Sequence, residues 1–109
     1  MINLRYLETS FPNHPELVAE VIDTLIIEYP SFVNHLKDAI RTNNLFQMSE
    51  IAHKWKYTAK ILGLDSLVSD LRQLEYCEKL NRLETEQLGQ KLFLQMESVF
   101  HELKSYEAA

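Results

Sequence analysis

The chain has 109 residues, of which 46% are hydrophobic and 25% charged, and its net charge at pH 7 is −5. This length predicts a single domain, residues 1–109, built around one hydrophobic core. Two glycines and three prolines are too few for an all-β fold with many turns. One cysteine excludes an internal disulfide and a cysteine-rich zinc site. The negative charge argues against nucleic-acid binding by bulk electrostatics.

Hydropathy and composition add two expectations. No segment has the basic start and apolar stretch of a signal peptide, and no apolar run approaches the roughly 18 residues of a membrane span. We therefore expect a cytoplasmic protein with no membrane partner. Leucine greatly outnumbers valine, which favours helix over strand.

The N-terminal segment predicts a short first helix followed by a break. Its hydrophobic residues recur at helical spacing: Leu4, Leu7 and Phe11. We therefore expect a helix within residues 2–11. Beyond the break, Asn13 with Glu16 three residues later is typical of a helix N-cap and its capping-box partner. Pro15 falls in the first turn of the next helix, where its missing N–H costs little.

A long second helix is expected from this cap to about Arg41. One stripe of hydrophobic residues follows it at ~100° per residue. These residues are Val18, Val21, Ile22, Leu25, Tyr29, Phe32, Val33, Leu36 and Ile40. Pro30 lies within the helix and should kink it, because proline removes the backbone hydrogen bond to Ile26.

The third helix has signals at both ends. Asn44 with Gln47 is a second candidate for a cap with its capping-box partner, and Gly63 stands where a helix C-terminus needs a left-handed residue. Between them, hydrophobic residues repeat in steps of three and four, as in a bundle helix. They are Leu45, Met48, Ala52, Trp55, Ala59 and Leu62.

Two further helices complete the chain. Asp65 or Ser66 is expected to cap the fourth helix and Thr85 the last one, after the polar stretch 81–84. The fourth stripe is Leu64, Leu67, Leu71 and Leu74; the last is Leu88, Leu92, Met96, Val99, Leu103 and Tyr106. Four amphipathic helices with short connections predict an all-α fold, an antiparallel up-down four-helix bundle with a short extra N-terminal helix over one end.

One histidine stands out by its surroundings. The segment from Ile51 to Leu64 contains no acidic residue but three lysines, Lys54, Lys56 and Lys60, a local charge of +3. His53 lies within it and follows Ala52 of the core stripe, so its side chain should reach the border with solvent. Its neighbours on the helix surface are Phe46, Ser49, Glu50, Lys56, Tyr57 and Lys60. The alternative interpretation is a solvated face with a chance histidine.

Such a patch suits phosphoryl acceptance. A neutral imidazole nitrogen is a competent nucleophile near pH 7, and nearby ammonium groups stabilise the charge of a phosphoryl group. The chain has no glycine-rich phosphate loop and no paired carboxylates for Mg²⁺, so a partner must bring the donor. We expect no metal site and no second catalytic group at His53; Glu50, one turn away, would at most orient the ring.

The segment 52–63 resembles the signature of histidine-containing phosphotransfer (HPt) domains. That signature reads A-H-x-L-K-G, then four variable residues, then L-G. The residues in register are Ala52, His53, Lys56, Leu62 and Gly63, with Trp55 in place of the usual leucine. The similarity extends to the long second helix with its internal proline, residues 17–40, and to an L-x-x-L-E segment at 71–75. The resemblance thus covers nearly the whole chain.

The resemblance implies a phosphorelay intermediate. His53 would take a phosphoryl group from the aspartyl phosphate of one receiver domain and pass it to another, and Lys56 would stabilise the phosphate. The partners would be response-regulator receiver domains or a hybrid sensor histidine kinase, and the docking surface would be formed by Phe46, Ser49, Glu50, Lys54, Tyr57 and Lys60. The protein would have no kinase activity and no cofactor of its own, because the receiver carries the Mg²⁺.

The family is usually monomeric, and a monomer is the expectation here as well. Four hydrophobic residues lie off the main stripes and leave pairing with another chain open: Ile27, Phe93, Leu94 and Phe100. They are either covered by the first helix or exposed.

Two residues depart from the family pattern. The family favours glycine four residues after the histidine and a small residue seven after it, where this chain has Tyr57 and Lys60. Helical side chains lean toward the N-terminus, so the Tyr57 ring should lean toward His53. There it would hinder transfer, shield the phosphohistidine, or bind the phosphoryl group through its hydroxyl. The alternative function is a non-catalytic adaptor that docks a receiver or kinase without carrying phosphate.

Overall fold

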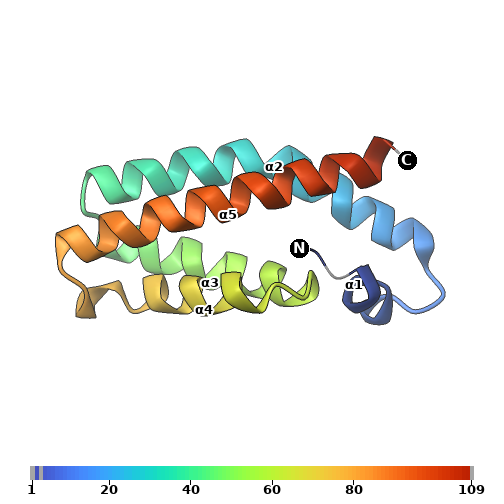
Figure 1. Ribbon diagram of the computed structural model, residues 1–109, viewed down its shortest axis with the longest axis horizontal. Coiled ribbons are helices and arrows are strands. Elements are labelled where there is room, and N and C mark those ends of the chain that lie inside the picture. The colour runs from blue at the N-terminus through green and yellow to red at the C-terminus, as the bar shows by residue number, and fades with distance from the viewer. Residues whose placement is uncertain (1, 3, 109) are drawn as a thin grey trace.

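The computed structural model describes residues 2 and 4–108. The helices follow one another as α1 (Leu4–Ser10), α2 (Pro15–Arg41), α3 (Leu45–Ile61), α4 (Asp65–Glu75), the short 3-10 helix η1 (Cys77–Lys79) and α5 (Arg82–Ala108). No strand occurs in these residues. Helices α2 to α5 run alternately up and down, and α1 lies at one end of the bundle (Figure 1). The all-α bundle with a short N-terminal helix is therefore confirmed.

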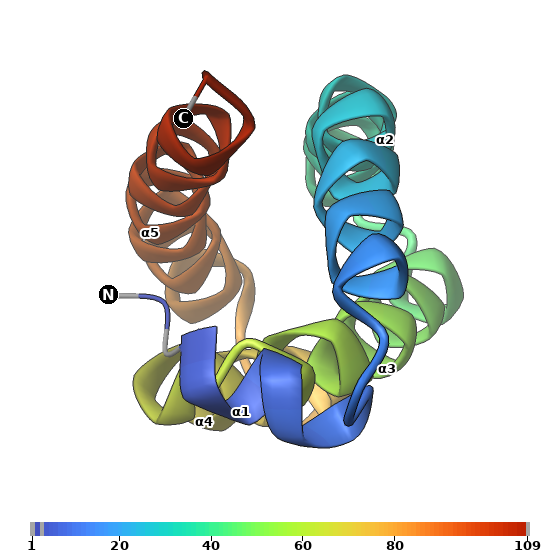
Figure 2. The same cartoon turned by 90° about the vertical axis from the view of Figure 1, so that its right-hand side faces the viewer.

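The helices differ in length, and this difference gives α1 its place. Helices α2 and α5 have 27 residues each, whereas α3 has 17 and α4 has 11. The long pair extends past the end of α3 and α4, where α1 lies across the bundle (Figure 2). Leu7 of α1 is fully buried there, and the backbone N–H of Ile2 donates to Glu102 Oε1 of α5 at 2.9 Å. The side chain of Leu4 lies outside the described part of the structure.

The predicted stripes form the core. Within the described residues, the buried hydrophobic residues of the four bundle helices all come from the predicted stripes, apart from Ala39 of α2. Leu45 is the one member of the α3 stripe that is exposed. Helix α2 continues through Pro30 as one helix, and its N-terminal part slopes away from the line of its C-terminal part (Figure 1), which agrees with the bend expected at Pro30.

Both predicted ends of α3 are confirmed. The side chain of Asn44 accepts a hydrogen bond from the backbone N–H of Gln47 at 3.1 Å and so caps the first turn. Gly63 has a φ of 70°, in the left-handed region that costs other residues energy. That conformation lets the N–H of Leu64 reach the carbonyl of Ala59 at 2.9 Å and close the helix. The helix that carries His53 is thus fixed at both ends.

The other predicted caps are wrong. Asn13 has a left-handed φ of 64°, and the residue before α2 is His14, which makes no side-chain cap bond. Helix α4 begins at Asp65, so Leu64 occupies the cap position and neither Asp65 nor Ser66 does. Helix α5 begins at Arg82, ahead of Thr85.

The start of α5 shows why Thr85 does not cap it. The side chain of Asn81 accepts from the N–H of Glu84 at 2.8 Å, and the Glu84 carboxylate accepts from the N–H of Asn81 at 3.0 Å. This reciprocal pair satisfies two backbone N–H groups at the start of the helix, ahead of Thr85. Thr85 is buried instead, and its hydroxyl donates to the Asn81 carbonyl at 3.0 Å. The short helix η1 before this cap has no predicted counterpart, and within it Cys77 is fully buried.

The hydrophobic residues off the stripes divide into two pairs. Ile27 and Leu94 are exposed, whereas Phe93 packs partly against the core and Phe100 is half-buried. The Phe100 ring stacks on Tyr29 with 4.2 Å between the ring centroids. No helix in the described part of the chain has the length and apolarity needed to cross a membrane.

Candidate functional site

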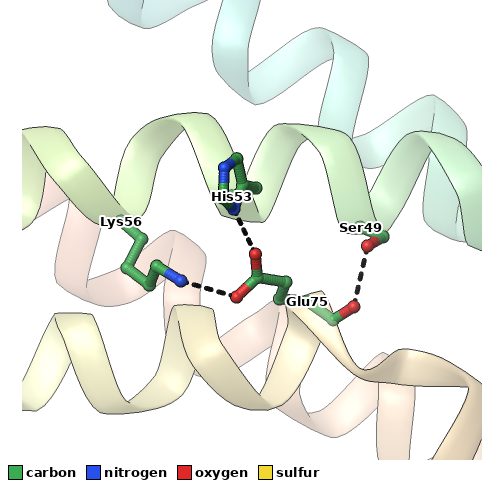
Figure 3. A network of polar contacts seen from close by, with 4 residues as sticks. All are labelled: Ser49, His53, Lys56 and Glu75. Carbon is green, nitrogen blue, oxygen red and sulfur yellow. Dashed lines mark hydrogen bonds and ion pairs between the residues drawn. The ribbon is translucent and has the colours of Figure 1, made fainter.

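Helix α3 places His53 at the protein surface. Its neighbours Ala52 and Trp55 are buried in the core. His53 directly follows Ala52 on the helix, so its side chain is turned away from the core. The His53 side chain is 54% exposed. The predicted exposure of this imidazole is therefore confirmed. Figure 3 shows the ring on the side of α3 that faces the end of α4.

A carboxylate from α4 holds two side chains of α3. Glu75, the last residue of α4, accepts a hydrogen bond from His53 Nδ1 through Oε2 and one from Lys56 Nζ through Oε1, the latter at 2.7 Å (Figure 3). Ser49 Oγ donates to the backbone carbonyl of Glu75 at 2.8 Å. Three donors one turn apart on α3 thus fix the position of Glu75. His53 and Lys56, the two residues predicted to carry the chemistry, are joined through one carboxylate.

This contact was not among the sequence predictions. The sequence predicted no second catalytic group at His53 and at most an orienting role for Glu50, whereas the carboxylate that contacts the ring is that of Glu75. The segment around His53 contains no acidic residue, but Glu75 of α4 lies against it and neutralises the charge of Lys56. The sequence signal was the glutamate that ends the L-x-x-L-E segment. Its contact with His53 depends on how α3 and α4 pack, which periodicity does not specify.

The carboxylate determines which nitrogen of His53 is free. The hydrogen bond from Lys56 holds the pKa of Glu75 below its ordinary value, against the opposing effect of burial, and the bond from His53 acts in the same direction. Glu75 is therefore ionised at neutral pH and can only accept hydrogen bonds. Nδ1 of His53 must then carry the proton. In the neutral imidazole the lone pair is then on Nε2, which has no hydrogen-bond partner among residues 2 and 4–108.

Lys56 is less accessible than the motif suggests. Its side chain is only 12% exposed, as is that of Glu75, and its ammonium group is already bound to the carboxylate. A phosphoryl group on His53 would therefore meet Lys56 as a member of a pair. The exposed lysines of the segment are Lys54 and Lys60.

Tyr57 covers the side of His53 toward the C-terminus of α3. The two rings meet edge to face, with 5.2 Å between centroids and an angle of 89°. The predicted lean of this ring toward the imidazole is therefore confirmed. Two ammonium groups lie near the same ring, Lys56 Nζ at 5.8 Å and Lys60 Nζ at 5.3 Å from its centroid. These cation–π contacts hold the ring in place.

An open groove lies on the opposite side of His53. It has a volume of about 910 Å³ and runs between α2 and α3 to the end of α4. Four of the residues predicted to contact a partner line it together with His53: Phe46, Ser49, Glu50 and Lys54. The other two, Tyr57 and Lys60, lie beyond His53 along α3. The predicted partner surface therefore has two parts: the open groove, and the stretch of α3 beyond His53 that carries Tyr57 and Lys60.

Two other histidines lie apart from this site. His14 pairs with Glu16 at 3.0 Å, and His101 lies 3.9 Å from Glu97, both on the surface. Among the residues that the structure describes, no group of three or more histidine, cysteine, aspartate or glutamate side chains is arranged to hold a metal ion.

Comparison of the chain with family models, with curated proteins and with solved structures finds no match. The functional argument therefore depends on the geometry around His53 and on the motif that surrounds it.

Proposed function

We propose that the protein is a phosphocarrier of the HPt type, which accepts a phosphoryl group on His53 from a receiver-domain aspartyl phosphate and passes it to another receiver domain. One observation carries the proposal: an exposed imidazole whose Nδ1–H is held by the Glu75 carboxylate and whose Nε2 is free. This arrangement fixes the tautomer and the ring orientation that a nucleophilic Nε2 needs.

The transfer balances without the loss of a proton. The lone pair of Nε2 attacks phosphorus, a P–N bond forms, and the P–O bond to the receiver aspartate breaks, releasing its carboxylate. The imidazole becomes positively charged and keeps its proton on Nδ1, where the Glu75 carboxylate stabilises the new charge. In the second transfer an aspartate oxygen of another receiver attacks the same phosphorus, and Nε2 leaves with its electron pair.

The lysines provide the electrostatic part of the proposal. Phosphorylation would place negative charge on the helix face that carries Lys56, and the proposal gives this ammonium group, now bound to Glu75, the task of stabilising the phosphoryl group. The exposed Lys54 lies at the edge of the groove and complements the acidic, Mg²⁺-carrying active site of a receiver. Under this proposal the receiver supplies the metal ion and the phosphoryl group, and the chain has no kinase activity of its own.

The test uses isolated receiver domains phosphorylated with labelled acetyl phosphate. We expect the wild-type protein to take up label that is acid-labile and base-stable, as phosphohistidine is, and we expect His53→Gln to take up none. His101→Gln is the matched control, because His101 is an exposed histidine on α5, outside the groove. It should be labelled like the wild type. Label that persists in His53→Gln would assign the site wrongly, and no label on the wild type while a reference HPt domain is labelled would refute the phosphocarrier.

A second function, a non-catalytic adaptor, is favoured by the surroundings of His53. Tyr57 contacts the ring on one side, and the ammonium group of Lys56 is already paired. An adaptor would bind receiver domains through the groove without taking label. Equal receiver affinity of the wild type and His53→Gln, measured by calorimetry and combined with absent labelling, would select this function.

A further inference from the structure

The two sides of His53 along α3 offer very different access to its free nitrogen. Toward the N-terminus the groove is open, and Phe46 and Glu50 stand at its edge. Toward the C-terminus the Tyr57 ring lies edge-on to the imidazole, with ring centroids 5.2 Å apart. A small molecule needs to meet only the imidazole, whose side chain is 54% exposed. A folded partner must cover several residues around the histidine, so it meets the tyrosine ring on the C-terminal side.

The Tyr57 ring is also held more firmly than an isolated surface aromatic. Lys60 Nζ lies 5.3 Å and Lys56 Nζ 5.8 Å from its centroid, and Lys56 is itself held by Glu75 at 2.7 Å. Moving the ring aside would break both cation–π contacts. An obstacle that is held in this way discriminates between partners, because specificity arises from clashes with the wrong partner as well as from contacts with the right one.

We propose that Tyr57 is the specificity-determining residue of this site, which restricts phosphoryl transfer to receiver domains that reach His53 from the groove between α2 and α3. This inference rests on the phosphocarrier function proposed above. It assigns the tyrosine ring, and not its hydroxyl, the task of excluding partners that would lie over the C-terminal half of α3. It also predicts that the intrinsic reactivity of His53 toward a small donor is independent of the ring.

The experiment compares a small donor with protein donors. The small donor is phosphoramidate: its P–N bond breaks, a P–N bond to His53 Nε2 forms, and ammonia leaves. The protein donors are a panel of isolated receiver domains, each phosphorylated with labelled acetyl phosphate. Both are applied to the wild type, Tyr57→Ala and Tyr57→Phe. Alanine removes the ring at an exposed helical position without a loss of helix propensity, so the fold is retained.

We expect phosphoramidate to label the wild type and Tyr57→Ala at similar rates. With the receiver panel, Tyr57→Ala should gain transfer of at least about tenfold from domains that transfer poorly to the wild type, because the clash is relieved. Tyr57→Phe keeps the ring and should behave like the wild type. Leu94→Ala is the control for the loss of a large exposed hydrophobic side chain, since Leu94 lies on α5, outside the groove and away from Tyr57. It should not widen the set of donors.

The outcomes separate this inference from the function on which it rests. An unchanged receiver profile in Tyr57→Ala overturns the inference while the phosphocarrier stands. An equal gain with phosphoramidate and receivers also overturns it, because the ring then acts on the histidine and not on the partner. A Tyr57→Phe variant that behaves like Tyr57→Ala would assign the effect to the hydroxyl and likewise contradict it. If no receiver labels His53 in any variant, the phosphocarrier itself fails, and the inference fails with it.

Discussion

Helix α4 carries two carboxylates that neighbouring helices bind from opposite directions. Asp70 faces α5 and Glu75 faces α3, and their side chains are 5% and 12% exposed. Each accepts hydrogen bonds from two side chains on its neighbour. The donors are Lys91 and Gln95 for Asp70, and His53 and Lys56 for Glu75. In the burial of the carboxylate and the number of its side-chain donors the two networks are nearly alike.

The difference lies in what each carboxylate leaves free. The donors to Asp70 are an ammonium group and an amide, and neither has a nucleophilic lone pair. One donor to Glu75 is an exposed imidazole, which donates a hydrogen bond from Nδ1 and, when neutral, has its lone pair on Nε2. A buried ion pair therefore does not by itself indicate a functional site. The exposed imidazole that the carboxylate orients distinguishes the Glu75 network from the Asp70 network.

The largest effect is expected from Glu75→Ala. Without the carboxylate the ring loses its fixed tautomer and orientation, and labelling of His53 by phosphorylated receiver domains should slow on the order of 100-fold. Glu75→Gln keeps an acceptor oxygen for Nδ1–H and should recover part of this loss. Rapid-quench labelling measures both rates. Asp70→Asn is the matched control, and its labelling rate per folded molecule should equal that of the wild type.

A purely structural role for Glu75 gives a different result. In that case Glu75→Ala would lower the free energy of unfolding but leave the labelling rate of the folded fraction unchanged. The glutamine variant would then show no recovery of rate relative to alanine.

The next effect is on stability and concerns the other carboxylate. Asp70→Ala removes two hydrogen bonds to a buried charged group and leaves the half-buried amide of Gln95 without its partner. We expect the free energy of unfolding to fall by about 2 kcal/mol. Guanidinium unfolding followed by circular dichroism measures it. If Asp70→Ala also slowed the labelling of His53 by a factor that corresponds to the same free energy, the two networks would be coupled through α4.

Most of the fold is predictable because it depends on spacing within single helices. The position of Trp55 among Met48, Ala52 and Ala59 determines which face of α3 is buried, and Gly63 determines where the helix ends. Prediction fails where two local signals compete. At the start of α5, Asn81 with Glu84 completes a reciprocal cap ahead of Thr85.

The site is only half predictable for a related reason. The exposure of His53 follows from its place next to Ala52 in one helix, and the lean of Tyr57 follows from the direction of helical side chains. The contact with Glu75 depends on the relative position of two helices, and the sequence within either helix does not specify it. The same applies to Lys56, whose exposure falls to 12% only because α4 covers it.

The pH dependence of stability tests the Glu75 network. Because the folded-state pKa of Glu75 is lowered, mainly by the hydrogen bond from Lys56, the ionised carboxylate stabilises the fold above its ordinary pKa of about 4.3. That contribution is lost as the pH falls through the lower folded-state value. Between about pH 5 and 3, the wild type should therefore lose stability more steeply than Glu75→Gln. Unfolding curves across this range measure the slopes, and parallel slopes would contradict the assignment.

The smallest effect is expected from the exposed partner of Asp70. The Lys91 side chain is 61% exposed, and its ammonium group lies 3.2 Å from Asp70 Oδ1. Exposed ion pairs contribute little because solvent screens them, so Lys91→Met should change the free energy of unfolding by less than about 1 kcal/mol. Lys56→Met should cost more, since Lys56 is 12% exposed and its loss leaves a buried carboxylate with one donor fewer. Unfolding of both variants at low and high salt tests this difference: added salt should reduce the Lys91 effect and leave most of the Lys56 effect, because only the exposed pair is screened.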